Sequence, residues 1–205
     1  MRIFKVIFAV FIAIFLSACG NENGDKKSEQ ISNFKEFKDG EEVVLKGVLG
    51  KDMTLVRKNG GFVVKGEEGK YLMLDIFGTF CPPCQKEAPE IMQYQLDNRD
   101  TFNIIGLTHF ENVTDEYVLN DFIKKYNAFY FITNDTAKNS RIAEQIVRDI
   151  AYKHEIALPF KVLLKDGYYQ ILTDNDTGKF GVKYYIGGIK MDRFKKDVER
   201  IEGLK

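Results

Sequence analysis

Apolar and polar residues alternate along this chain with a period that changes from segment to segment. Residues 42–65, EVVLKGVLGKDMTLVRKNGGFVVK, break into short Val- and Leu-rich runs separated by Gly-Lys-Asp and Asn-Gly-Gly. These separators are typical of tight turns, so the region predicts a small antiparallel hairpin arrangement. Residues 71–77 and 102–107 are nearly continuous apolar runs, which are typical of strands buried on both faces of an α/β sheet.

Four later segments repeat their apolar residues at helical spacing and predict amphipathic helices. The second begins at Thr114, which precedes two acidic residues that suit a helix N-terminus. Residues 129–132 predict a short strand, and the runs FKVLL and YYQIL flank Asp166-Gly167, a strong hairpin signal. The predicted helices span about 84–98, 114–126, 136–153 and 191–203.

The predicted order is a hairpin, then strand, helix, strand, helix, strand and helix, followed by a second hairpin and a last helix. Parallel strands joined by right-handed crossovers and closed by an antiparallel hairpin form a central mixed sheet with helices on both faces. The fold class is therefore α/β with an N-terminal β-hairpin extension. The pattern contains no internal repeat and no second domain.

The apolar run at the start of the chain has a different origin. Arg2 and Lys5 precede uninterrupted apolar residues 6–16, and small residues then lead to Cys19. The run is shorter than the roughly 20 residues that span a bilayer, so it is typical of a secretory signal. The sequence LSAC resembles a bacterial lipobox, which implies removal of residues 1–18 and a lipid on Cys19; an uncleaved anchor helix is the alternative.

Either arrangement holds the rest of the chain at a bacterial membrane, outside the cytoplasm, and on the periplasmic side if the cell has an outer membrane. Residues 19–35 are polar and without apolar periodicity, so they predict a flexible tether. Residues 36–205 have the length of one domain, which we expect to be monomeric. Loss of residues 1–18 leaves 28 of the 30 basic residues against 30 acidic ones, a balance that argues against nucleic-acid binding.

Apart from Cys19, the cysteines are Cys81 and Cys84, in the stretch DIFGTFCPPCQKEAP. If a helix begins near Cys81, unpaired amides and the helix dipole favour an anion there, and such an environment lowers the pKa of a thiol. Pro82 suits a helix start because it loses no hydrogen bond there. Cys81 is therefore predicted to attack disulfides, and Cys84, almost a turn further on and facing inward, to resolve the mixed disulfide.

A structural disulfide and a metal site are alternative interpretations of this pair. A bridge that closes so short a loop restricts the unfolded chain little. Zinc requires four ligands, and neither His109 nor His154 belongs to a second paired cluster. Gln85 follows the motif where haem attachment requires His. A copper carrier that uses both cysteines and one histidine remains open. The favoured interpretation requires no metal or cofactor.

The segment LDIFGTFCPPCQKEAP resembles the active-site segment of the thioredoxin superfamily. Its pattern of Cys81, Cys84, Glu87 and Pro89 is similar to that of the membrane-tethered TlpA/ResA/CcmG group, and Leu158-Pro159 in ALPFKVLLKDG matches the position of the family's cis-proline. The resemblance covers roughly residues 40–203. It implies the thioredoxin fold and thiol–disulfide exchange.

The resemblance also implies roles for individual residues. Pro159 in cis would place a backbone edge beside Cys81 for an extended substrate. Asp75, where thioredoxins have a buried acid, would take the proton of Cys84; the alternative is a strand-end acid bonded to nearby amides. Glu87 would tune the thiols or would simply be solvated.

The expected substrate groove contains Phe80, Pro82, Leu158 and Phe160. Two of these residues depart from the group's pattern. Phe80 stands where the family usually has Trp, so an indole N–H donor is missing. Phe160 stands where the group often has Thr, so a hydroxyl is missing from the expected groove.

The sequence thus predicts a lipid-anchored thiol–disulfide oxidoreductase that acts outside the cytoplasm. We expect it to reduce disulfides of substrate proteins with electrons from a membrane thiol reductant. By family resemblance the substrate is apocytochrome c, which would place the protein in cytochrome c biogenesis. The alternatives are a disulfide oxidase or isomerase of the same fold, a copper-binding assembly lipoprotein, and a non-catalytic lipoprotein that binds a partner.

Overall fold

The computed structural model describes residues 34–203. The chain divides into two units, residues 1–35 and 36–205, and the second contains every strand and helix of the described residues. The predicted signal peptide, Cys19 and residues 19–33 of the predicted tether lie outside the described residues. Within residues 34–203, no helix has the length and apolar character needed to cross a membrane.

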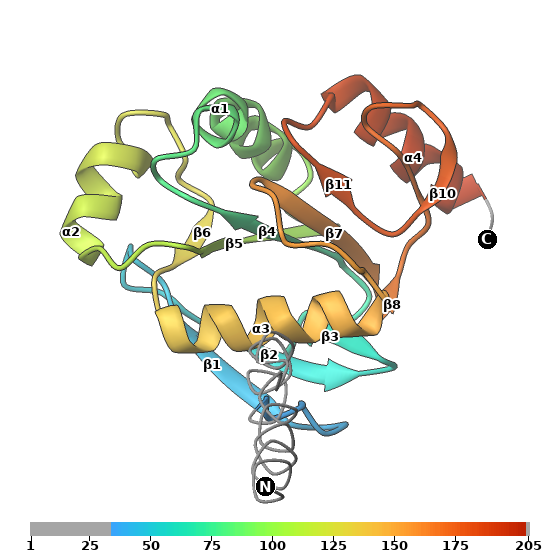
Figure 1. Ribbon diagram of the computed structural model, residues 1–205, viewed down its shortest axis with the longest axis horizontal. Coiled ribbons are helices and arrows are strands. Elements are labelled where there is room, and N and C mark those ends of the chain that lie inside the picture. Colours follow the sequence, from blue (N-terminus) through green and yellow to red (C-terminus); the bar gives the residue numbers. More distant parts are fainter. Residues whose placement is uncertain (1–33, 204–205) are drawn as a thin grey trace, which may run out of the picture. The chain divides into compact units, whose positions relative to one another are not determined.

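A central mixed sheet runs through the second unit, as the sequence predicts (Figure 1). Its strand order is β11-β7-β4-β5-β6, and β8 pairs with the end of β7. The β4–β5 and β5–β6 pairs are parallel, whereas β7 is antiparallel to β4, β8 and β11. The strands are β4 (Tyr71–Phe77), β5 (Phe102–Thr108), β6 (Phe131–Thr133), β7 (Phe160–Lys165), β8 (Tyr168–Tyr169) and β11 (Tyr185–Ile186).

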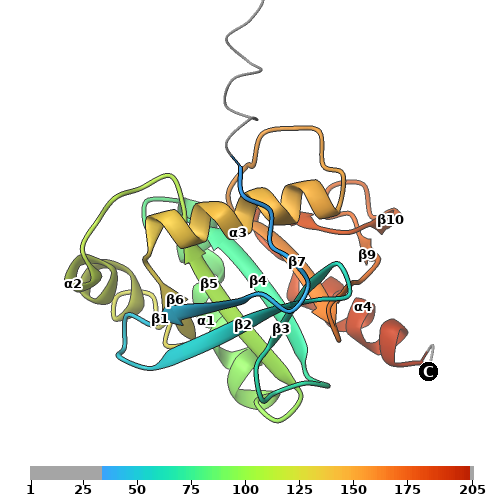
Figure 2. The ribbon, with the colours of Figure 1, turned by 90° about the horizontal axis from the view of Figure 1, so that it is seen from below.

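Helices cover both faces of the sheet, as expected (Figure 1). One face packs against α1 (Pro82–Asp97), α4 (Met191–Gly203) and a short helix, α2 (Asp115–Tyr117), that continues as the π-helix η1 (Val118–Ile123). The other face packs against α3 (Thr136–Asp149) and the N-terminal strands (Figure 2). Each face has its own apolar core, because successive side chains of a strand point to opposite sides of the sheet.

The predicted N-terminal hairpin is a three-stranded antiparallel sheet. It consists of β1 (Glu42–Lys46), β2 (Asp52–Lys58) and β3 (Gly61–Val64), in that order. Asn59 and Gly60 form the second turn with φ values of 52° and 81°, as an Asn-Gly hairpin turn requires. The amide of Val48 donates to the carbonyl of Ile132 at 2.8 Å, which joins this small sheet to the edge of the central one.

Three predicted elements differ from the structure. The helix that begins at Thr114 changes to π-helical geometry after its first turn. The helix predicted to reach residue 153 ends at Asp149. The run YYQIL does not form one strand: β8 stops after two residues, and β9 (Leu172–Thr173) pairs instead with β10 (Phe180–Val182). Apolar periodicity locates each of these segments but does not determine which partner it pairs with.

Candidate functional site

Cys81 and Cys84 lie where the central strand β4 leads into helix α1 (Figure 1). Cys81 is the N-cap of α1, Pro82 is its first residue, and the Sγ atom of Cys81 accepts a hydrogen bond from the amide of Cys84 at 3.4 Å. The two cysteines form a disulfide with a Cα–Cα distance of 5.3 Å. Cys84 is 2% exposed and Cys81 5%. Upon reduction, the helix amides and dipole would therefore act on the sulfur of Cys81.

The loop before Cys81 is held from two sides through Thr79. The carboxylate of Glu111 accepts the amide of Thr79 at 2.8 Å and its hydroxyl at 2.5 Å. The Nε2 atom of Gln85 donates to the carbonyl of Thr79 at 2.7 Å. These contacts hold the backbone of the residues that precede Cys81 in place. No sequence motif indicates them, since Glu111 lies in a loop beyond β5 and Gln85 on α1.

The Leu158–Pro159 peptide bond is cis, as the resemblance implies. Pro159 directly precedes β7, and the antiparallel register places Phe160 opposite Ile76, next to the end of β4. The proline therefore lies at the same end of the sheet as the loop that carries Cys81. The carbonyl of Pro159 accepts a hydrogen bond from the amide of Gly187 at 3.0 Å, so this carbonyl belongs to the internal bonding of the fold.

The four residues predicted to line a substrate groove have different environments. Phe80 is 54% exposed, Pro82 is exposed and Leu158 is half-buried. Phe160 is fully buried in the core on the α3 side and stacks on Tyr184 at a ring-centroid distance of 5.4 Å. The assignment of Phe160 to the groove is therefore wrong. As the first residue of β7, it points to the opposite face of the sheet from the next residue, Lys161.

Asp75 and Glu87 lie in the interior with a lysine between them. Lys161 Nζ is 3.0 Å from Asp75 Oδ1 and donates a hydrogen bond to Glu87 Oε1. The other carboxylate oxygen of Glu87 accepts the amide of Ile189 at 2.7 Å. Asp75 is thus not an amide-bonded acid at a strand end, and the alternative in which Glu87 is solvated is wrong, because its side chain is buried by the chain around it.

Sheet geometry explains why these three residues meet. Asp75 pairs with Lys161 across β4 and β7, and residues opposite each other in an antiparallel pair point to the same face. That face is covered by α1, which carries Glu87. The neighbour of Asp75 on β5 is Gly106, and a side chain there would meet Phe77, Tyr130 and Ile132. Lys161 is not among the residues predicted for the site, although a lysine inside the apolar run FKVLL was a visible signal.

Burial and charge act in opposite directions on these groups. Burial raises the pKa of Asp75, and it raises the pKa of Glu87 to about 6; the nearby Lys161 offsets part of each effect. Burial alone would lower the pKa of Lys161, but the charges and hydrogen bonds of Asp75 and Glu87 raise it on balance. Carboxyl groups whose pKa values are raised by burial are suited to general acid–base chemistry.

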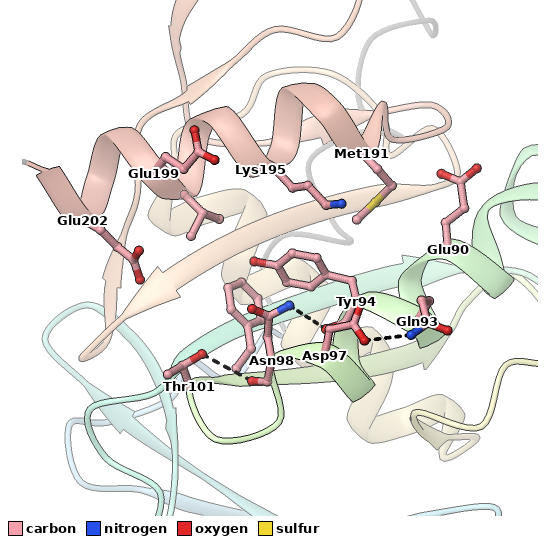
Figure 3. Close-up of a pocket in the computed structure, with 12 residues that line it drawn as sticks. Glu90, Gln93, Tyr94, Asp97, Asn98, Thr101, Met191, Lys195, Glu199 and Glu202 are labelled. Carbon is pink, nitrogen blue, oxygen red and sulfur yellow. Dashed lines mark hydrogen bonds between the residues drawn. The ribbon is translucent and has the colours of Figure 1, made fainter.

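Among the described residues, no group of three or more His, Cys, Asp and Glu side chains has the arrangement of a metal site. A hollow of about 450 Å³ lies between α1 and α4 (Figure 3), and neither cysteine lines it. Its lining includes Glu90, Tyr94, Asp97, Lys195 and Glu202, and it contains none of the predicted site residues.

Comparison with known proteins identifies the fold of this chain. No family model and no curated protein matches the sequence. Solved structures do match: StoA from Bacillus subtilis is 21% identical with a TM-score of 0.50, and the match covers 78% of this chain and 97% of StoA. A thiol:disulfide interchange protein of the thioredoxin family from Chlorobium tepidum is 18% identical with a TM-score of 0.52, covering 81% and 97%. The chain has the thioredoxin fold.

A secreted Mycobacterium tuberculosis disulfide oxidoreductase, described as homologous to E. coli DsbE, shares the thioredoxin fold with this chain. It is 18% identical with a TM-score of 0.50, and the match covers 77% of this chain and 95% of that protein. The fold expected from the sequence is therefore confirmed. In this thioredoxin fold, Cys81 and Cys84 stand at the start of α1, and the cis-proline precedes β7.

Proposed function

We propose that this protein is a lipid-anchored thiol–disulfide oxidoreductase that reduces disulfides of proteins outside the cytoplasm. The observation that carries the proposal is the Cys81–Cys84 disulfide at the N-terminus of α1 in a thioredoxin fold. The solved proteins of similar fold include ones described as a disulfide oxidoreductase and a thiol:disulfide interchange protein. That likeness supports the same chemistry in this chain.

The reaction begins with the reduced protein. The thiolate of Cys81 attacks one sulfur of a substrate disulfide, and the other substrate sulfur leaves as a thiolate. Cys84 then loses its proton and attacks the sulfur of Cys81, which forms the Cys81–Cys84 disulfide and releases the second substrate thiolate. Two electrons pass to the substrate, and a membrane thiol reductant restores the dithiol.

Substrate binding is proposed at the surface around Cys81. Phe80 and Pro82 are exposed on either side of this cysteine, and Leu158 precedes the cis-proline. An extended substrate segment would pair with the backbone before Pro159, because the carbonyl of Pro159 already bonds to Gly187. Apocytochrome c, with its own pair of cysteines before haem attachment, is the proposed substrate.

The test is insulin reduction in the presence of dithiothreitol, measured by turbidity. Wild type is expected to accelerate precipitation of the insulin B chain, Cys81→Ser to abolish the acceleration, and Cys84→Ser to accumulate a mixed disulfide visible on a non-reducing gel. The proposed chemistry would be contradicted if wild type did not accelerate insulin reduction and the Cys84→Ser variant formed no mixed disulfide.

The anchor is tested separately. In the full-length protein expressed in a bacterium, Cys19→Ala is expected to move the protein from the membrane fraction to the soluble fraction and to abolish incorporation of labelled palmitate. Retention of Cys19→Ala in the membrane without label would favour an uncleaved anchor helix.

A further inference from the structure

The hollow between α1 and α4 has an acidic lining (Figure 3). Its charged residues are four acids and one lysine: Glu90, Asp97, Glu199, Glu202 and Lys195. None of these side chains forms an ion pair within residues 34–203, and Asp97 only accepts a hydrogen bond from Gln93 at 2.7 Å. Because the chain as a whole has a formal net charge of zero, negative charge is concentrated at this hollow.

Two arginines of α4 do not compensate these acids, because they bond to residues outside the hollow. Arg193 Nη1 donates to the carbonyls of Asp174 and Asn175 at 2.7 and 2.5 Å. Arg200 Nη2 donates to Asp197 at 2.9 Å. None of these five residues lines the hollow. The carboxylates of the hollow therefore lack matching cations among the side chains that surround them.

The buried part of the lining is apolar and contains a hydroxyl without a partner. Tyr94, Phe102 and Val198 are 7%, 1% and 8% exposed. In Figure 3 the Tyr94 side chain extends between the two helices, and its hydroxyl makes no hydrogen bond to the described residues. Burial, together with the charge of Glu202, raises the pKa of Tyr94 to about 12, so the hydroxyl stays neutral. Its oxygen is available to accept a hydrogen bond from a ligand that enters the hollow.

The positions of the acids indicate the shape of such a ligand. In Figure 3, Glu90 is at one end of the hollow and Glu202 at the other. Glu90 and Asp97 are seven positions apart on α1, which corresponds to about 10 Å along the helix axis. The volume of about 450 Å³ lies in the range of small-molecule sites, about 300–1,000 Å³. An extended cation with several ammonium groups would reach acids at both ends, whereas a single small ion would not.

We propose that the hollow between α1 and α4 binds a flexible aliphatic polyamine of the spermidine class. Its ammonium groups pair with the carboxylates of Glu90 and Glu202, and its methylene chain lies against Tyr94 and Val198. One ammonium N–H donates to the Tyr94 hydroxyl. Lys195 is exposed, so its own ammonium group stays in water. Neither cysteine lines the hollow, and this binding does not depend on the thiol chemistry.

The experiment measures the binding of radiolabelled spermidine to the full-length protein in a non-ionic detergent by equilibrium dialysis. Wild type should bind spermidine saturably at low salt, and added salt should weaken the binding, because salt screens exposed charges. Glu90→Gln combined with Glu202→Gln should weaken binding about tenfold, since each exposed ion pair contributes a few-fold.

Two further variants separate a defined site from a general attraction of cations to acids. Tyr94→Phe removes only the hydroxyl and leaves every charge in place, and it should weaken binding by about three- to tenfold. Glu116→Gln combined with Glu155→Gln is the matched control, because it removes the same charge at exposed positions that do not line the hollow. The control should bind spermidine as wild type does.

The proposal is overturned if wild type shows no saturable binding, or if the control weakens binding as much as the double substitution in the hollow. It is also overturned if Tyr94→Phe binds as tightly as wild type. N-acetyl-trilysine amide has the same charge as spermidine and represents lysine side chains of a protein. Tighter binding of this peptide than of spermidine would contradict a free polyamine as the ligand.

Discussion

Glu87 makes the stability of the protein depend on pH. Burial raises its pKa from 4.5 to about 6, so between these values the folded protein holds a proton that the unfolded chain has released. The contribution of Glu87 to stability is therefore fully present below about pH 4.5 and declines as the pH rises through about 6. At 1.36 kcal/mol per pKa unit, the decline is on the order of 2 kcal/mol.

Glu87→Gln removes this group from the titration. Urea unfolding at pH 4.5 and pH 7 should show that wild type loses more stability over this interval than Glu87→Gln does, by on the order of 2 kcal/mol. Asp135 and Asp197 have lowered pKa values, so their effect is to raise stability as the pH rises. This effect is the same in wild type and in Glu87→Gln, and it cancels in the comparison. An equal change in the two proteins would show that Glu87 titrates normally in the folded state.

Some residues of the site could be predicted from the sequence, and others could not. Cys81, Cys84 and Pro159 stand in short local motifs, so their positions could be predicted without the fold. The partners of Lys161 are brought to it by the register of the sheet and by the packing of α1, and Glu87 is 74 residues away in the chain. A local motif therefore does not reveal them. The wrong assignment of Phe160 has the same origin: the face to which a strand residue points depends on the register of its sheet.

Between elements, the two hairpin turns of residues 59–60 and 166–167 lie against each other. Asn59 Nδ2 donates to the carbonyl of Asp166 at 2.9 Å. Gly60 and Gly167 both have positive φ, at 81° and 85°, but a Cβ on Gly167 would lie 2.2 Å from the carbonyl oxygen of Lys58, whereas one on Gly60 would meet nothing. Position 167 therefore requires glycine for two reasons, its positive φ and the close approach of the Lys58 backbone.

Gly167→Ala and Gly60→Ala form a matched pair. Both substitutions force an alanine into positive φ, which costs roughly 1 kcal/mol, and Gly167→Ala adds the backbone clash. Thermal unfolding should therefore show a clearly lower Tm for Gly167→Ala than for Gly60→Ala. Equal losses would mean that the two turns separate without cost.

Arg57 connects the N-terminal sheet to helix α3. Its two terminal nitrogens bond both carboxylate oxygens of Asp149, at 2.5 and 2.7 Å, and both side chains are largely buried. Arg57→Met leaves Asp149 without its cation and should cost on the order of 3–5 kcal/mol in urea unfolding. The exposed pair of Lys65 and Glu42 provides the control: Lys65→Met should cost at most about 1 kcal/mol. Similar losses for both would contradict the buried role of Arg57.

At the scale of elements, apolar periodicity located every long strand and helix. The Asn-Gly and Asp-Gly turns also fold as predicted, with positive φ at all four residues. The short strands β9, β10 and β11 were not predicted, since two or three residues carry no measurable period and their pairing is determined by the sheet they join.

At the scale of the whole molecule, the order of elements predicted an α/β fold, and the resemblance of two motifs to the thioredoxin superfamily implied the thioredoxin fold. The order specifies a mixed sheet with helices on both faces, and the motifs place a cysteine pair and a cis-proline at one end of it. Direction of electron flow is a different matter, because it depends on the relative stability of the dithiol and the disulfide, which neither the order nor the motifs contain.

The reduction potential of the Cys81–Cys84 couple tests the central claim most directly. The domain of residues 36–205 is equilibrated with a series of thiol–disulfide buffers, and the oxidised fraction is measured by alkylation of the free thiols. A reductase should show one two-electron transition near the thioredoxin value, about −270 mV. A transition near about −120 mV would make the protein an oxidase, and the absence of any two-electron transition would contradict a redox role for the pair.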